Sequence, residues 1–144
     1  DKGFFRVVVK VIARQRETGV PLAQVAQSRM YLAGALLLTG SREEAVAEAD
    51  AAVAEVAAAT SACDRAVVTV LLQVGTIFSA YGGARESLAY LERAFECTKS
   101  QPAVAALAPR VAGAIMWSYR RLEDAEGEAR WRAVAEQLRR PAGP

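Results

Sequence analysis

The apolar positions of this sequence recur with the period of an α-helix along most of its length. Between residues 42 and 59, apolar side chains return every three or four positions and the carboxylates fall between them. Segments of the same character follow one another, separated by short stretches rich in Gly, Ser or Pro. The pattern predicts an all-α protein with helices over residues 4–17, 22–39, 42–59, 64–81, 84–98, 103–121 and 124–140.

The first segment contains three consecutive β-branched residues, Val7 to Val9, which a strand would favour. Its polar residues Arg6, Lys10 and Arg14 nevertheless lie four apart, as they do along one face of a helix. A half-buried strand would alternate apolar and polar residues, and this run does not. We therefore expect an N-terminal helix within residues 1–20. It would cover the first open face of the core.

Local signals mark several helix ends. Gly19 and Pro21 suit the end of one helix and the first turn of the next. Ser41 is a favourable N-cap, and Glu44 would complete a capping box with it. Pro109 lies inside the segment 103–121, where we expect it to kink the helix or to delay its start by a turn.

Two of the helix pairs share one sequence pattern. When Gly40 is placed on Gly82, the surrounding residues correspond over the whole pair. Small residues at corresponding positions would let two helices approach closely. The small residues pair as Ala33 with Gly75 and as Ala45 with Ser87.

A weaker third copy covers residues 103–138. Gly113 occupies the small position of its first helix, and Gly127 with Trp131 occupies a later part of the pattern. The turn that begins at Leu122 lacks the glycine and is expected to be about two residues longer than the others.

This pattern resembles the tetratricopeptide repeat. The matching residues are Leu32, Ala33, Leu36, Gly40, Ala45 and Ala52 in the first copy and Gly75, Phe78, Gly82, Ser87, Leu91 and Ala94 in the second. The resemblance implies a right-handed solenoid of three helical hairpins over residues 21–140. An N-terminal helix precedes them, as the end of a preceding repeat or as a cap, and residues 141–144 follow as a tail or a linker. The copies lie 42 residues apart, longer than the family's 34, which longer helices would explain.

The resemblance also implies a groove along the first helices of the hairpins. Its positions carry over to Met30, Tyr31, Leu37, Leu72, Gln73, Thr76, Arg110 and Trp117, with Gln27, Gly34, Thr69, Ser79, Ala114 and Ser118 in the wider set. The family's clamp for a terminal carboxylate uses Lys and Asn, whereas Arg110 is the one cation here, so we do not expect that ligand. The composition suits an apolar or amphipathic peptide. Trp117 is the strongest candidate contact, although it and the larger apolar residues could equally be buried.

Sequence motifs for catalysis are missing. The chain has no His, which is the usual general base and the commonest metal ligand, and no phosphate-binding glycine loop. We therefore expect a protein that is not an enzyme and binds no cofactor or metal.

Charge and hydropathy point to no nucleic acid or membrane. The net charge is +2, and no apolar run approaches the length of a membrane span. The basic residues cluster at two places, which we interpret as ordinary solvated faces rather than contacts to nucleic acid. They are Arg6, Lys10, Arg14 and Arg16 near the start, and Arg130, Arg132, Arg139 and Arg140 near the end.

The two cysteines, Cys63 and Cys97, fit no metal-binding spacing. We expect two free thiols in a reducing cytoplasm. A disulfide is the alternative, and the sequence offers no support for it.

Together these features predict a non-catalytic scaffold that binds a protein or peptide. By style of sequence it looks like a regulatory segment of a larger bacterial protein, such as a transcription regulator. One alternative is a homo-oligomerisation module that pairs through the solenoid ends and the apolar Phe4 and Phe5. Another is a small-molecule sensor with a cavity near Tyr31, Phe78 and Trp117.

Overall fold

The computed structural model describes residues 2–17, 19 and 21–141, which form an all-α protein without strands in that part of the chain. The helices are α1 (Lys2–Glu17), α2 (Leu22–Leu38), α3 (Arg42–Ala59), α4 (Arg65–Ala80), α5 (Ala84–Ser100), α6 (Ala108–Arg121) and α7 (Ala125–Arg139). A short 3-10 helix, η1 (Pro102–Leu107), leads into α6. The all-α prediction and the seven helices are confirmed within these residues. Residues 142–144 of the predicted tail and the side chain of Arg16 lie outside the described part.

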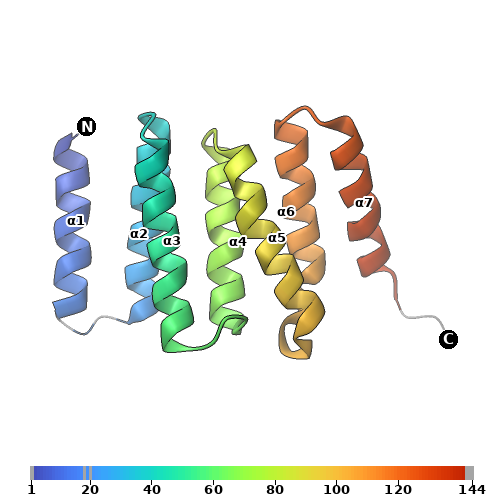
Figure 1. Ribbon diagram of the computed structural model, residues 1–144, viewed down its shortest axis with the longest axis horizontal. Helices are drawn as coiled ribbons and strands as arrows, with labels where there is room; N and C mark the ends of the chain where they lie inside the picture. Colours follow the sequence, from blue (N-terminus) through green and yellow to red (C-terminus); the bar gives the residue numbers. More distant parts are fainter. Residues whose placement is uncertain (1, 18, 20, 142–144) are drawn as a thin grey trace.

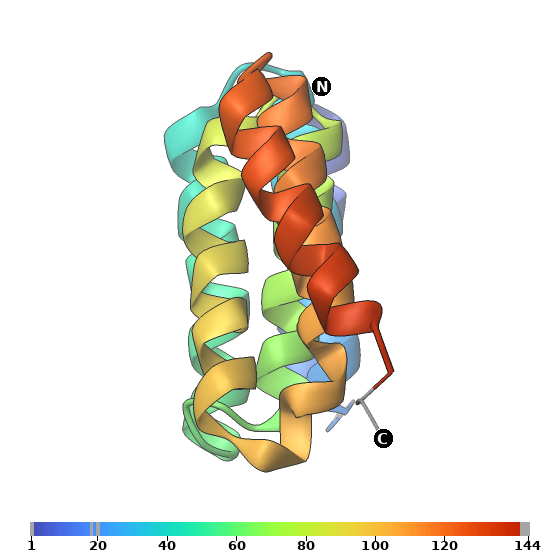
Figure 2. The same ribbon diagram turned by 90° about the vertical axis from the view of Figure 1, so that its right-hand side faces the viewer.

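The helices stand side by side and pack in consecutive pairs (Figure 1). The most extensive contacts join α2 with α3, α4 with α5, and α6 with α7. The first helices of the pairs also contact one another, α2 with α4 and α4 with α6, while α3 packs on α4 and α5 on α6. Seen end-on, α3 and α5 therefore lie to one side of α2, α4 and α6 (Figure 2). One face of α2, α4 and α6 points away from α3 and α5.

The three pairs close through turns of one geometry. In each turn one residue has a positive φ, and the next N–H donates to a carbonyl five residues earlier, as in a Schellman motif. The residues with positive φ are Gly40 (83°), Gly82 (90°) and Glu123 (58°). The bonds run from Ser41 to Leu36 (2.8 Å), from Gly83 to Phe78 (2.7 Å) and from Asp124 to Tyr119 (3.0 Å). The prediction of a longer third turn is wrong, because Glu123 adopts the left-handed conformation that glycine takes in the other two.

The capping predicted at the start of α3 is absent from the structure. Ser41 makes no side-chain capping bond, so the predicted capping box is wrong. Its ψ of 66° lies outside the extended region from which an N-cap side chain reaches the helix, and the serine side chain is short. Asp124, with a similar ψ of 88°, has the longer side chain and accepts a hydrogen bond from the Gly127 N–H. Pro109 lies in the first turn of α6, after η1, so the predicted delay of this helix is confirmed.

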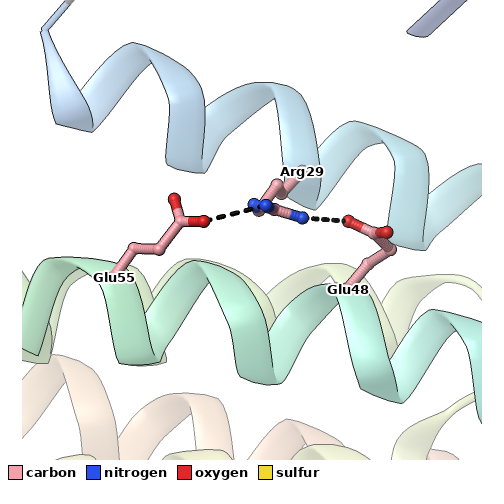
Figure 3. Close-up of polar contacts among 3 residues, drawn as sticks. All are labelled: Arg29, Glu48 and Glu55. Carbon is pink, nitrogen blue, oxygen red and sulfur yellow. Dashed lines mark hydrogen bonds and ion pairs between the residues drawn. The ribbon is translucent and has the colours of Figure 1, made fainter. Parts of the chain in front are cut away.

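Polar contacts tie the helices together beneath the surface. Arg29 of α2 reaches between two carboxylates of α3, Glu48 and Glu55, with N–O distances of 2.8 Å to each (Figure 3). Its side chain is only 11% exposed, so this ion-paired group stabilises the first hairpin in a largely desolvated setting. Ser87 of α5 donates to Ser118 of α6 over 2.8 Å, and both residues are fully buried.

Cys63 and Cys97 form a disulfide, so the prediction of two free thiols is wrong. Cys63 lies in the link between α3 and α4, and Cys97 lies in the last turn of α5. These segments meet at the same end of the helix stack, which brings the two Cα atoms to 5.3 Å. The expectation of a cytoplasmic location relied on free thiols in a reducing compartment. Because disulfides persist in oxidising compartments, the bond removes that support.

Candidate binding surface

The inner face is the surface of α2, α4 and α6 that points away from α3 and α5. Each of these helices presents residues at positions i, i+4, i+7 and i+11, which lie on one side of a helix. The stripes are Gln27, Tyr31, Gly34 and Leu38 on α2, Thr69, Gln73, Thr76 and Ala80 on α4, and Arg110, Ala114, Trp117 and Arg121 on α6. Large apolar side chains are exposed here, with Tyr31 at 62%, Leu38 at 68% and Trp117 at 50%. Exposed aromatic and aliphatic side chains in one stripe are typical of a contact surface.

Three hollows lie along this face. The first, of about 470 Å³, is lined by Phe4, Val8, Val11, Ser28, Met30, Tyr31, Gly34, Ala35, Leu38, Ile77 and Tyr81. The central one, of about 300 Å³, is lined by Gln27, Met30, Tyr31, Leu72, Gln73, Thr76, Ile77 and Arg110. The third, of about 250 Å³, is lined by Thr76, Ser79, Ala80, Ala114, Trp117 and Arg121.

The hollows form one continuous surface because they share side chains. Tyr31 and Met30 belong to both the first and the central hollow. Thr76 belongs to both the central and the third. A bound segment could therefore pass from α1 across α2 and α4 to α6 without leaving the surface.

The structure brings together most of the residues that sequence reasoning selected. Met30, Tyr31, Leu72, Gln73, Thr76 and Arg110 all line the central hollow. Trp117 lines the adjoining third hollow. Met30 and Leu72 are only 4% and 7% exposed, so they contribute to the floor rather than to the rim. Leu37 lies in the core, close to Gly83, and lines none of the three hollows.

The repeat pattern does not predict the contribution of α1. Phe4 and Val11 of this helix form one wall of the first hollow, and Tyr81 of α4 forms the other. Gly34 lies on the floor, where a Cβ atom would come within 3.2 Å of the Tyr81 ring. The signal in the sequence was the spacing of Phe4, Val8 and Val11, which puts more apolar surface on α1 than its contact with α2 covers.

Some polar groups of the inner face and its surroundings form contacts within the protein. Gln27 donates to the Tyr31 hydroxyl over 3.2 Å, and the Thr76 hydroxyl donates to the Leu72 carbonyl over 2.8 Å. Ser79 Oγ is buried and has no hydrogen-bond partner in the described residues. The guanidinium of Arg120 stacks on the Trp117 ring, 4.8 Å from its centroid. Phe78, expected near a ligand cavity, is fully buried in the core.

This arrangement supplies surface for noncovalent contacts. The described residues contain no cluster of three or more His, Cys, Asp or Glu side chains that could hold a metal ion. Within that same part of the chain, no helix combines the length and the apolar character that crossing a membrane requires.

Comparison with known proteins assigns the chain to no family. No protein-family model, curated protein or solved structure matches it. The likeness to tetratricopeptide repeats therefore rests on the residues of this chain alone.

Proposed function

We propose that this chain is a tetratricopeptide-like, right-handed helical repeat, and that it is a non-catalytic scaffold whose inner face binds a peptide or a segment of another protein. One observation carries the proposal: three hollows share side chains and form a continuous surface across α2, α4 and α6. Tyr31 and Trp117 stand exposed on that surface. Large aromatic side chains of this kind dominate the binding energy of protein interfaces.

The repeat interpretation is supported by the spacing of equivalent residues. The turn residues Gly40, Gly82 and Glu123 are 42 and then 41 positions apart. The inner-face positions Gln27, Thr69 and Arg110 follow at the same two intervals. The turn residues and the inner-face residues therefore recur at the same intervals in all three hairpins, as expected for a stack of repeated units.

A scaffold of this kind fits a regulatory part of a larger bacterial protein, such as a transcription regulator. This step is an analogy with proteins of similar sequence style rather than a property of the site.

The proposal is tested by truncating Trp117. A peptide selected from a random display library against the whole chain serves as the ligand, with affinity measured by fluorescence anisotropy. Trp117→Ala is expected to weaken binding by roughly tenfold to thirtyfold, the loss typical of a hot-spot residue, while helicity by circular dichroism stays unchanged. Leu138→Ala is a suitable control, because Leu138 is 40% exposed on α7, outside the three hollows. Unchanged affinity in Trp117→Ala, or a loss of helicity, would overturn the assignment.

Self-association is a second candidate function. Among the described helices α1 packs on α2 alone, and it exposes Phe4 (51%), Val7 (59%) and Val11 (45%). Two copies could bury these side chains against each other. Sedimentation equilibrium over a wide concentration range distinguishes the candidates, because self-association through α1 predicts a dimer that Val7→Lys disrupts.

A further inference from the structure

We infer that the segment bound on the inner face has an apolar end and an acidic end. Its apolar side chains fill the first hollow, between α1 and α4, and its carboxylates pair with arginines of α6. The inference rests on the proposed function, to which it adds the chemistry of the partner.

Charge is divided between the helices. The inner helices α2, α4 and α6, together with η1, contain no Asp or Glu. Their charged residues are all arginines: Arg29, Arg65, Arg110, Arg120 and Arg121. Most of the carboxylates lie on the other helices, at Glu43, Glu44, Glu48, Asp50 and Glu55 of α3, at Glu86, Glu92 and Glu96 of α5, and at Glu126, Glu128 and Glu136 of α7. Asp64, Glu123 and Asp124 lie in the links before α4 and after α6. An inner layer of one sign favours a partner of the opposite sign.

Intramolecular ion pairs account for two of these arginines. Arg29 is held by Glu48 and Glu55, so its charge is directed towards α3. Arg120 approaches Glu128 of α7 over 3.6 Å.

The remaining three arginines have no carboxylate within ion-pair distance in the described part of the chain. Arg110 lines the central hollow and Arg121 lines the third. Arg65 lines a neighbouring hollow between α2 and α4, beside Gln27 and Gln73. All three residues are exposed. A guanidinium in this position can form two parallel hydrogen bonds to a carboxylate.

The polarity of the inner face changes from one end to the other. No charged side chain lines the first hollow, whose walls and rim are formed by Phe4, Val11, Leu38 and Tyr81. At the other end, Arg110 and Arg121 stand eleven residues apart on α6, on either side of Trp117. Packed helices lie 8–10 Å apart, so the distance from α2 to α6 is roughly 20 Å. About six residues of extended chain span it, which sets the separation between the apolar and acidic ends of the ligand.

A nucleic acid fits this surface less well. Its phosphates could pair with the arginines and its bases could stack on Tyr31, but the exposed aliphatic side chains of the first hollow, Val11 and Leu38, would have no apolar partner. A peptide with an apolar end and an acidic end can contact both the first hollow and the arginines of α6.

The test is a selection of random peptides displayed on phage against the whole chain. Selected peptides are expected to carry apolar residues separated by about six positions from a pair of Asp or Glu residues. A synthetic selected peptide should bind at least tenfold more weakly to the double variant Arg110→Glu, Arg121→Glu. Arg93→Glu is the matched control, because Arg93 is exposed on α5 and should leave the affinity unchanged. Selection against the double variant should enrich Lys and Arg in place of the acidic residues.

The outcomes separate this inference from the function on which it rests. Selected peptides that are apolar without acidic residues, and that bind the double variant as well as the wild type, would contradict the inference and leave the scaffold proposal standing. A selection without any enriched binder would contradict both. Two further results would replace the peptide with another occupant: tight binding of a single-stranded oligonucleotide that the double variant loses, or a wild-type dimer that the double variant loses.

Discussion

Gly75 of α4 and Leu91 of α5 meet where the two helices approach closely. A Cβ atom at position 75 would lie 2.4 Å from Leu91 Cδ2, and Leu91 is fully buried. Only a residue without a side chain fits this position while the helices keep their separation. The sequence already indicated a small residue here, because Gly75 occupies the place of Ala33 in the other copy.

Gly75→Ala is expected to destabilise the protein by about 1–3 kcal/mol, because the new methyl group overpacks the contact with Leu91. The higher helix propensity of alanine offsets only about 1 kcal/mol. Gly113→Ala is the matched control: it also lies inside a helix, and its Cβ would meet only the tip of Arg139, at 3.6 Å. That variant should be stabilised by up to about 1 kcal/mol. Urea denaturation measures both, and equal effects at the two positions would contradict the packing of α4 on α5.

Glu123→Gly is expected to stabilise the protein by about 0.5–1 kcal/mol. Glu123 has a φ of 58°, which costs a residue with a side chain about 1 kcal/mol or more relative to glycine. Gly82→Ala is the converse change, because Gly82 has a φ of 90° and open space around it. It should lose about 1 kcal/mol. If thermal unfolding shows Glu123→Gly to be less stable than the wild type, the third turn does not share the geometry of the others.

Replacing Cys63 and Cys97 with Ser is expected to lower the free energy of unfolding by about 3–4 kcal/mol. The two residues are 34 positions apart, and loss of the cross-link restores the chain entropy of a loop of that size to the unfolded state. Guanidinium denaturation with and without a reducing agent measures the loss. The double variant should be insensitive to the reductant. Two titratable thiols in the unreduced, denatured wild type would show that the bond is absent.

Tyr90→Phe tests a contact between hairpins and has a pH signature. The Tyr90 hydroxyl donates to Asp50 Oδ1 over 2.9 Å, and burial, followed by this bond, raises the pKa of the Tyr90 phenol above its usual value near 10. The folded state therefore holds this proton more tightly than the unfolded state. Its stabilisation is complete below pH 10 and is lost as the pH rises further.

The variant should lose about 1 kcal/mol at pH 7, and the difference from the wild type should narrow above pH 10. Urea denaturation at pH 7 and above pH 10 measures the free energy of unfolding of the variant and of the wild type. Tyr31→Phe serves as control, because the exposed hydroxyl of Tyr31 should contribute little at either pH. A difference between Tyr90→Phe and the wild type that stays constant with pH would contradict a raised pKa.

The helices were predictable because their signals are local. The polar spacing of Arg6, Lys10 and Arg14 separated helix from strand in α1, and Pro109 marked the late start of α6. The positive φ of Glu123 was not predictable, because glutamate carries no preference for that conformation. The pairing of Cys63 with Cys97 depends on which ends of the hairpins meet, which the spacing of two cysteines does not encode.

The sequence predicts most of the residues on the inner face, but on α2 it selects Leu37 in place of its neighbour Leu38. Leu37 and Leu38 are adjacent, so their side chains point about 100° apart around α2. The repeat pattern predicts Leu37 on the inner face, yet Leu38 is 68% exposed and Leu37 is buried. Which leucine faces outward depends on where α3 and α4 pack, and the composition of a nearly uncharged helix does not show that.

The most direct test of the proposed binding surface is a map of chemical shift changes by nuclear magnetic resonance. The isotope-labelled chain would be titrated with a peptide selected against it. We expect the largest changes at Tyr31, Gln73, Thr76 and the indole N–H of Trp117, with little change along α3 and α5. Changes concentrated on α3 and α5, with the inner face unaffected, would contradict the proposed binding surface.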